Sequence, residues 1–232
     1  MQPATAKAPD SNALERVGGA TLQIVHDLKN QLNGLKLYAT FLRKRLERDD
    51  QPADERETLA KLITGLDRAA KDLTALVRYA RPVELRKRSG VDIRRIVSQV
   101  IAEAAERETG GLPKVTIGAD FEDASFVGEF DPAALTEAIK AITEDVRATI
   151  SAKEPQPLSI AMRRDQDAGQ AMIEWRGAKF KTRGGSLSSI GCGTIHTEVA
   201  AKIVEAHGGA VTCDQDVIRA VLPLSRIETK NQ

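Results

Sequence analysis

The chain has 232 residues, of which 41% are hydrophobic and 29% charged, which is enough for one or two soluble domains with packed cores. Lys and Arg number 34 against 33 Asp and Glu, and this balance argues against a dedicated nucleic-acid-binding protein. Aromatic residues make up only 3%, which excludes a stacking platform for single-stranded nucleic acid. There is no apolar run of about 18 residues, so no transmembrane helix is expected, and the two cysteines predict reduced thiols and a cytoplasmic setting.

The first predicted helix spans residues 12–47, after a polar stretch over residues 1–11 that predicts a disordered tail. Apolar or small residues recur in this helix with the heptad spacing that is typical of packing along a seam. One row holds Leu14, Thr21, Leu28, Leu35 and Leu42, and the other holds Val17, Ile24 and Tyr38. Pro52 ends the helix in a polar turn.

The second predicted helix ends before Pro82 and carries a similar pair of rows. Leu59, Leu66, Leu73 and Ala80 form one row, and Leu62, Ala69 and Leu76 form the other. Two long helices joined by a short turn make an antiparallel hairpin over residues 12–82. A lone hairpin leaves much of its apolar surface in water, so we expect a homodimeric four-helix bundle. The alternative is that the hairpin packs on the rest of its own chain.

Residues 90–226 predict a second domain of the α+β class, with helices on one face of a mixed sheet. Strand patterns cover residues 114–121, 125–130, 158–164, 170–176, 211–213 and 217–222, and helix patterns cover 92–108, 132–151 and 194–206. Asp131-Pro132 marks a helix start, and Gly208-Gly209 marks a helix end. Residues 177–193 hold five glycines and predict a loop, and residues 227–232 predict a tail.

His26 lies on the side of the first helix farthest from the predicted seam, so its imidazole is expected to face water. A neutral imidazole is a competent nucleophile for phosphorus. Asp27 can accept a hydrogen bond from one ring nitrogen and leave the other nitrogen available for attack. Lys29 adds positive charge near an incoming phosphate, and Asn30 can donate to a phosphoryl oxygen or position a water. The alternative is a solvated histidine without a role.

The face that carries His26 continues along the helix through Asn33, Leu37 and Thr40. Leu37 is an apolar residue at a position expected to be exposed, which makes it a candidate contact for a docking partner, although single exposed leucines are common.

The segment His26-Asp27-Leu28-Lys29-Asn30-Gln31-Leu32 resembles the phosphoacceptor box of the two-component histidine kinases. Members of that family usually have proline where Gln31 stands. Residues 77–82 resemble the end of the family's second helix, and residues 203–209 resemble the stretch that follows the lid of its ATP-binding domain. The resemblance covers roughly residues 12–224 and implies a dimeric helical hairpin followed by an α/β sandwich.

The resemblance also implies roles for individual residues of the box. His26 corresponds to the phosphorylated residue and Asp27 to its acid/base helper. Asn30 corresponds to the residue that can assist dephosphorylation of a partner. The partner implied is the receiver domain of a response regulator.

The family binds ATP with three elements, and the sequence departs from each of them. The helix that bears two asparagines corresponds to residues 135–148, which have Ala141 and Asp145 at those positions. Asp145 keeps an oxygen ligand for Mg²⁺. The Asp-x-Gly element reads Trp175-Arg176-Gly177, and an indole cannot accept a hydrogen bond from the adenine amine.

The third element, a phosphate-binding loop, corresponds to Gly191-Cys192-Gly193 only after a shift of one residue. The sequence therefore predicts a histidine-kinase architecture with a degenerate nucleotide site. Asp145, Gly177, Gly191 and Gly193 are the residues that remain to bind ATP and Mg²⁺.

The first interpretation is a cytoplasmic histidine phosphotransfer protein of a phosphorelay. In it His26 exchanges a phosphoryl group with a receiver aspartate, with no cofactor beyond the partner's Mg²⁺. The second interpretation is an ATP-dependent histidine kinase with a divergent site, and the third is a non-catalytic dimeric docking module. Neither nucleic acid nor a membrane is an expected partner. The spacing of Cys192, His196, His207 and Cys213 fits no common zinc site.

Overall fold

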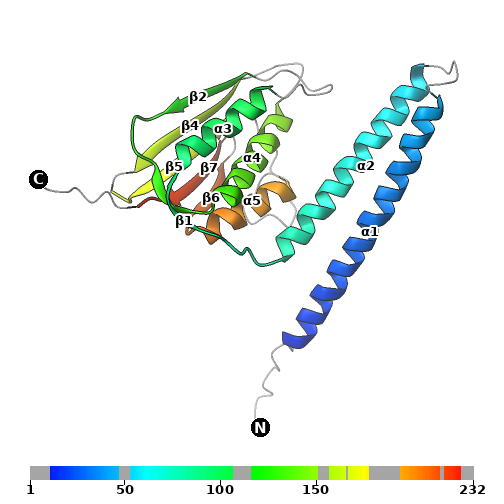
Figure 1. Ribbon diagram of the computed structural model, residues 1–232, viewed down its shortest axis with the longest axis horizontal. Helices are drawn as coiled ribbons and strands as arrows, with labels where there is room; N and C mark the ends of the chain where they lie inside the picture. Colours follow the sequence, from blue (N-terminus) through cyan, green and yellow to red (C-terminus); the bar gives the residue numbers. More distant parts are fainter. Residues whose placement is uncertain are drawn as a thin grey trace, which may run out of the picture. The chain divides into compact units, whose positions relative to one another are not determined.

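The computed structural model describes residues 11–46, 53–106, 116–150, 157–165, 167–177, 194–214 and 217–225. For residues 11–24, 26, 45, 46, 53, 54 and 56 the description covers the backbone alone. The chain divides into two compact units, Met1–Pro82 and Val83–Gln232 (Figure 1). The second unit begins before residue 90 because the segment that follows Pro82 is tied to it by hydrogen bonds.

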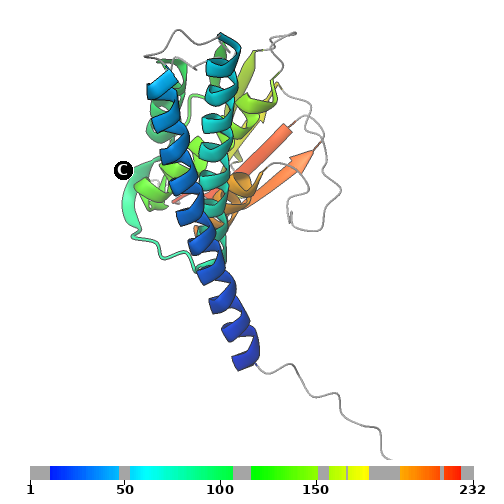
Figure 2. The ribbon, with the colours of Figure 1, turned by 90° about the vertical axis from the view of Figure 1, so that its right-hand side faces the viewer.

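The first unit is a hairpin of α1 (Ser11–Leu46) and α2 (Ala53–Ala80), which run side by side in both views (Figure 1, Figure 2). Val25 and Ala39 are buried on α1, and the half-buried Leu32 lies midway between them. This spacing of seven residues puts all three on one face of the helix. Ile63 and Ala75 are the buried residues of α2. The seam inside the hairpin is therefore built mainly from small and β-branched side chains.

The leucine row that the heptad spacing predicted on α1 does not face α2. Leu28, Leu35 and Leu42 are 44%, 54% and 50% exposed, and Tyr38 is 69% exposed. Within the hairpin, α1 packs on α2 through the row of Val25, Leu32 and Ala39, and burial of the predicted row in a four-helix bundle stays a prediction. A large apolar row on α1 is thus left without cover from α2.

The second unit contains a five-stranded sheet in the order β2-β4-β5-β7-β6. Its strands are β2 (Ile117–Phe121), β4 (Leu158–Asp165), β5 (Gln170–Arg176), β6 (Ala210–Asp214) and β7 (Val217–Pro223). β2 pairs with β4 in parallel, and the other pairs are antiparallel. The mixed sheet and the α+β class expected from the sequence are confirmed.

A separate two-stranded sheet pairs β1 (Arg88–Asp92) with β3 (Val127–Phe130). The sequence analysis did not predict β1. This strand has little apolar alternation, and its register is irregular between Arg88 and Val91, around Gly90, which has φ of 76°. Few residues other than glycine adopt that conformation without strain.

Helices α3 (Ile93–Glu106), α4 (Pro132–Thr149) and α5 (Ile195–Ala206) cover one face of the five-stranded sheet (Figure 1, Figure 2). Alternate residues of β4, β5 and β7 are buried against them, as the two-residue period of a strand requires. Asp131 caps α4 by accepting hydrogen bonds from the Ala133 and Ala134 amides, and Thr194 caps α5. The two caps fix where α4 and α5 begin.

Candidate functional site

The predicted phosphoacceptor, His26, lies in the interior of α1, which continues without interruption from Ser11 to Leu46. The neighbouring Asp27 and Asn30 are exposed, and Lys29 is half-buried. Val25, immediately before His26, is 6% exposed and belongs to the hairpin seam. The backbone around residue 26 is therefore held by a packed helix, and the acid and the amide of the box lie at its solvent-facing surface.

The docking residues expected on the face of His26 follow one another along α1. Asn33 is exposed, Leu37 is 69% exposed, and Thr40 is partly buried and donates from Oγ1 to the Lys36 carbonyl at 2.8 Å. Phe41, which the sequence analysis missed, is 66% exposed. It follows Leu37 by one helical turn, and this spacing could have revealed it. Leu37 and Phe41 together form an exposed apolar pair on the side of α1 away from the Leu35 row.

Trp175, which the resemblance aligns with the adenine-binding carboxylate, is fully buried at the end of β5. Its indole Nε1 donates to the Oγ1 of Thr143 on α4, 3.0 Å away, and that hydroxyl in turn donates to the Ile139 carbonyl at 2.7 Å. The polar atoms of the Trp175 and Thr143 side chains are therefore satisfied by hydrogen bonds inside the core. The sequence analysis did not anticipate Thr143 as the partner of Trp175.

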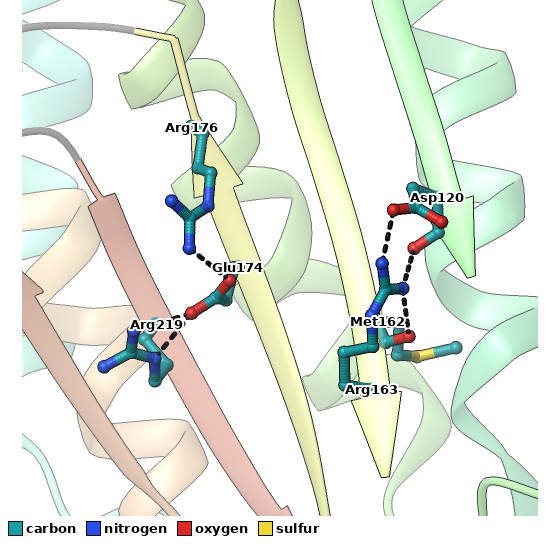
Figure 3. Close-up of polar contacts among 6 residues, drawn as sticks. All are labelled: Asp120, Met162, Arg163, Glu174, Arg176 and Arg219. Atoms are coloured by element: carbon teal, nitrogen blue, oxygen red, sulfur yellow. Dashed lines mark hydrogen bonds and ion pairs between the residues drawn. The ribbon is translucent and has the colours of Figure 1, made fainter. Parts of the chain in front are cut away.

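Glu174, the acidic neighbour of Trp175, does not replace the missing carboxylate. Successive strand residues point to opposite faces of a sheet, so Glu174 lies on the face away from α4. There it accepts hydrogen bonds from Arg176 Nη2 at 2.8 Å and from Arg219 Nε at 2.8 Å (Figure 3). The pKa of Glu174 lies below its usual value, chiefly because of the hydrogen bond from Arg176. The two arginines cover the carboxylate, which leaves Glu174 only 7% exposed.

Asp145, the predicted Mg²⁺ ligand of α4, is occupied by the start of α5. Its Oδ2 accepts hydrogen bonds from the Thr194 amide, the Thr194 hydroxyl and the Thr197 hydroxyl. Ala141, one turn earlier, is half-buried against the hydrophobic core. Asp145 thus joins α4 to α5 through Oδ2. These hydrogen bonds use one of the two oxygens with which the carboxylate could bind a cation.

Gly177 has a structural reason to be glycine that does not involve a nucleotide. Its φ is 128°, and a Cβ at this position would lie 2.5 Å from the Pro157 carbonyl oxygen. Gly191 and Gly193 lie outside the described residues. Within the described ranges, no group of three or more His, Cys, Asp or Glu side chains is placed to hold a metal ion. Cys213 on β6 is disulfide-bonded, whereas the cysteine count predicted reduced thiols.

Comparison with known proteins gives no match among protein-family models or curated protein sequences. Solved structures do match. Full-length ShkA in complex with AMPPNP superposes with a TM-score of 0.60 and 16% identity, over 89% of this chain and 46% of that chain. The histidine kinase AdeS of Acinetobacter baumannii superposes with a TM-score of 0.57 and 12% identity, over 87% of this chain and 98% of that chain. The chain has the fold of a histidine kinase.

The histidine-kinase fold confirms the resemblance that the phosphoacceptor box indicated. The chain spans about half the length of ShkA and nearly all of the AdeS structure. Among the helices that the structure describes, none combines the length and the apolar character needed to cross a bilayer.

Proposed function

We propose that this chain is a histidine phosphotransfer protein of two-component signalling. In this proposal His26 carries a phosphoryl group and exchanges it with the aspartate of a response-regulator receiver domain. The observation that supports transfer between proteins, rather than transfer from ATP, is the burial of Trp175. An indole bonded to Thr143 stands where the resemblance places the adenine-binding carboxylate, while the phosphoacceptor box on α1 keeps His26, Asp27 and Asn30.

The chemistry needs little more than a positioned imidazole. One ring nitrogen of His26 attacks the phosphorus of the receiver's acyl phosphate, and a nitrogen–phosphorus bond forms as the phosphorus–oxygen bond breaks. The departing aspartate carboxylate keeps the electron pair. The proton on the other ring nitrogen stays in place, where Asp27 can accept a hydrogen bond from it. Mg²⁺ bound to the receiver neutralises charge on the phosphoryl oxygens, and Asn30 can orient one of them.

The docking surface in this proposal is the apolar pair of Leu37 and Phe41, with Asn33 and Thr40 beside it. A receiver that contacts this face is brought close to His26, which lies about three turns away along the same side of the helix. Apolar anchors of this kind contribute most of the energy of small interfaces.

The proposed assembly is a homodimer in which two hairpins form a four-helix bundle. Leu28, Leu35, Leu42 and Tyr38 form an exposed apolar row on the described part of α1, and Leu62 and Leu76 of α2 are also exposed. A second copy of the chain has a matching row, so a symmetric interface covers both. The row lies on the side of α1 opposite position 26, so this interface does not use the face on which the receiver is proposed to dock.

The deciding experiment supplies the purified chain with ³²P-labelled phospho-receiver and, separately, with γ-³²P ATP. We expect acid-labile label on the chain from the phospho-receiver and none above background from ATP. The variant His26→Ala loses the label, whereas His196→Ala, a substitution of one of the chain's other two histidines, keeps it. No label from any of several phospho-receivers, or signalling that survives His26→Ala, contradicts the proposal and favours a docking module.

The second candidate function is an ATP-dependent histidine kinase. It is favoured by the likeness to ShkA, whose structure holds the ATP analogue AMPPNP. Label on His26 from ATP in the experiment above supports this candidate, and binding of a fluorescent ATP analogue measures the nucleotide site directly.

A further inference from the structure

The chain that leaves the hairpin is fastened to the second unit at one point before β1. The backbone N–H of Arg86 donates to Oδ2 of Asp131 at 2.8 Å. Asp131 precedes α4, and its other carboxylate oxygen, Oδ1, accepts hydrogen bonds from the amides of Ala133 and Ala134 at 3.0 and 3.1 Å. One carboxylate thus caps a helix with one oxygen and holds the connecting segment with the other.

The backbone of Asp131 is itself held by His207. The Asp131 N–H donates to Nε2 of His207 at 3.0 Å, and Nδ1 of the same ring lies 2.8 Å from the Ile203 carbonyl. A carbonyl can only accept, so Nδ1 carries the proton and Nε2 is the acceptor of a neutral ring. His207 is 2% exposed and packs against Phe130, with the ring centroids 5.8 Å apart. No step of the proposed phosphoryl transfer uses His207.

We propose that Arg86, Asp131 and His207 form a proton-controlled latch that fastens the segment 83–87 to the α4–α5 pair. In the closed state the neutral His207 ring accepts the Asp131 N–H and holds Asp131 where its Oδ2 meets the Arg86 amide. Proton uptake at Nε2 removes the acceptor and places two N–H donors against each other. Asp131 then shifts, and the Arg86 amide is released to solvent. This latch does not depend on the proposed phosphotransfer function.

The charged groups that act on the ring are Asp131 at the start of α4 and Lys87 in the connecting segment. Burial is the main cause that lowers the pKa of His207, and Lys87 lowers it further, while the hydrogen bond to Ile203 and the Asp131 carboxylate raise it. The latch is therefore closed at neutral pH and opens only below the usual range of a histidine.

The start of β1, which follows residues 83–87, is expected to lose its pairing with β3 when the latch opens. Arg88 pairs with Phe130, but the register is irregular between Arg88 and Val91, where Gly90 has a φ of 76°. The Arg88 pair is thus separated from the regular pairing of Val91 with Gly128. Release at Arg86 frees the connecting chain as far as Gly90, which lengthens the tether between the two units.

The test measures amide hydrogen exchange in the full chain by NMR from pH 7.5 down to pH 4, with protection factors corrected for intrinsic rates and the His207 ring followed in the same samples. In the wild type we expect protection of the Arg86 and Asp131 amides to fall about tenfold or more with the same midpoint as His207 protonation. His207→Gln keeps an acceptor near the position of Nε2 but cannot titrate, so its protection stays independent of pH.

A second variant separates the latch from the helix cap. Asp131→Asn keeps one oxygen to cap α4 but presents an NH₂ group to Arg86, so we expect lost protection at Arg86 and retained protection at Ala133 and Ala134. Protection of the β5 amides shows whether each variant is folded. If a variant is unfolded, the pH series of the wild type tests the latch by itself. Arg86 protection that is unchanged across His207 protonation, or unchanged in folded Asp131→Asn, overturns the latch.

Discussion

At the scale of single residues, Trp175 and Thr143 form a buried polar pair between β5 and α4. The site between β5 and α4 is filled by the indole, whose only polar atom is satisfied by Thr143. A buried N–H without an acceptor costs about 1–3 kcal/mol, so the indole and the threonine depend on each other. Their contact stabilises the core where β5 meets α4.

The first prediction concerns this pair. Thr143→Val removes the acceptor but keeps the shape, so we expect the free energy of unfolding to fall by about 1–3 kcal/mol. Chemical denaturation followed by the fluorescence of Trp175, the only tryptophan in the chain, measures the change. Thr136→Val is the matched control, because Thr136 is only partly buried and its hydroxyl donates to the Pro132 carbonyl of its own helix. Equal stability of the two variants contradicts the prediction.

The second prediction concerns Glu174 and pH. Its carboxylate has a lowered pKa in the folded chain, so its stabilising effect is present above the usual pKa of an unfolded glutamate and is lost as the pH falls through the lowered value. Glu174→Gln cannot lose a charge in that range. We expect it to be about 1–3 kcal/mol less stable than the wild type at pH 7 and closer to it at pH 3.5, by urea unfolding.

The control for this series is Glu129→Gln, at an exposed position of β3. A gap between wild type and Glu174→Gln that stays constant from pH 7 to pH 3.5 rules out the role given to the Arg176 and Arg219 contacts.

At the scale of elements, α1 carries three different faces. Val25, Leu32 and Ala39 face α2, the row of Leu28, Leu35 and Leu42 is exposed, and Leu37 with Phe41 is exposed on the side of His26. Such a helix is apolar around much of its circumference, which is typical of a helix that meets more than one partner.

The third prediction uses two exposed leucines on these faces as a matched pair. Leu35→Glu places a charge in the proposed dimer row and is expected to convert the dimer to a monomer, as measured by sedimentation equilibrium. Leu37→Glu is expected to keep the dimer and to slow phosphoryl transfer from the receiver about tenfold or more. A dimer that survives Leu35→Glu, or one that is lost with Leu37→Glu, contradicts the assignment of the faces.

The fourth prediction concerns the contact between α4 and α5. Asp145→Ala removes the acceptor of the Thr197 hydroxyl, and Thr197 is fully buried. We therefore expect the free energy of unfolding to fall by about 1–3 kcal/mol. Glu144→Ala, at the exposed neighbouring position, is the control and is expected to stay within about 0.5 kcal/mol of the wild type. A strong effect of Mg²⁺ on the stability of the wild type, absent in Asp145→Ala, instead assigns Asp145 to a cation.

At the scale of the whole molecule, the two units have independent cores. The buried residues of the hydrophobic core in the second unit run from Ile93 to Leu222. The half-buried residues that pack against this core also follow Pro82 in the sequence. The hairpin is held together by the packing of α1 against α2. Units of this kind are expected to unfold as separate cooperative transitions.

The fifth prediction follows from this division. A fragment of residues 83–232 is expected to unfold cooperatively in denaturant, with Trp175 in an apolar environment and a midpoint close to that of the full chain. Tryptophan emission measures the unfolding transition and its midpoint, and near-ultraviolet circular dichroism reports the packing around Trp175. A fragment that lacks a cooperative transition shows that the hairpin contributes to the core.

The sequence by itself determined the elements and the family of the fold. Heptad spacing predicted α1 and α2, the Asp131-Pro132 cap predicted the start of α4, and the phosphoacceptor box pointed to the histidine kinases. These signals are local, because helix periodicity and capping depend on residues within a few turns of each other. The missed strand β1 lacks a local signal, since its pairing with β3 comes from a distant segment.

Only the tertiary structure decided which apolar row faces α2 and what the polar residues of the second unit do. Leucine at heptad spacing marks an apolar face but does not say which element covers it, so the sequence could not show that α2 packs on the row of Val25, Leu32 and Ala39. The bonds of Trp175 to Thr143 and of Asp131 to His207 join residues that are far apart in the chain. Such contacts depend on how the sheet and helices pack, which no local pattern records.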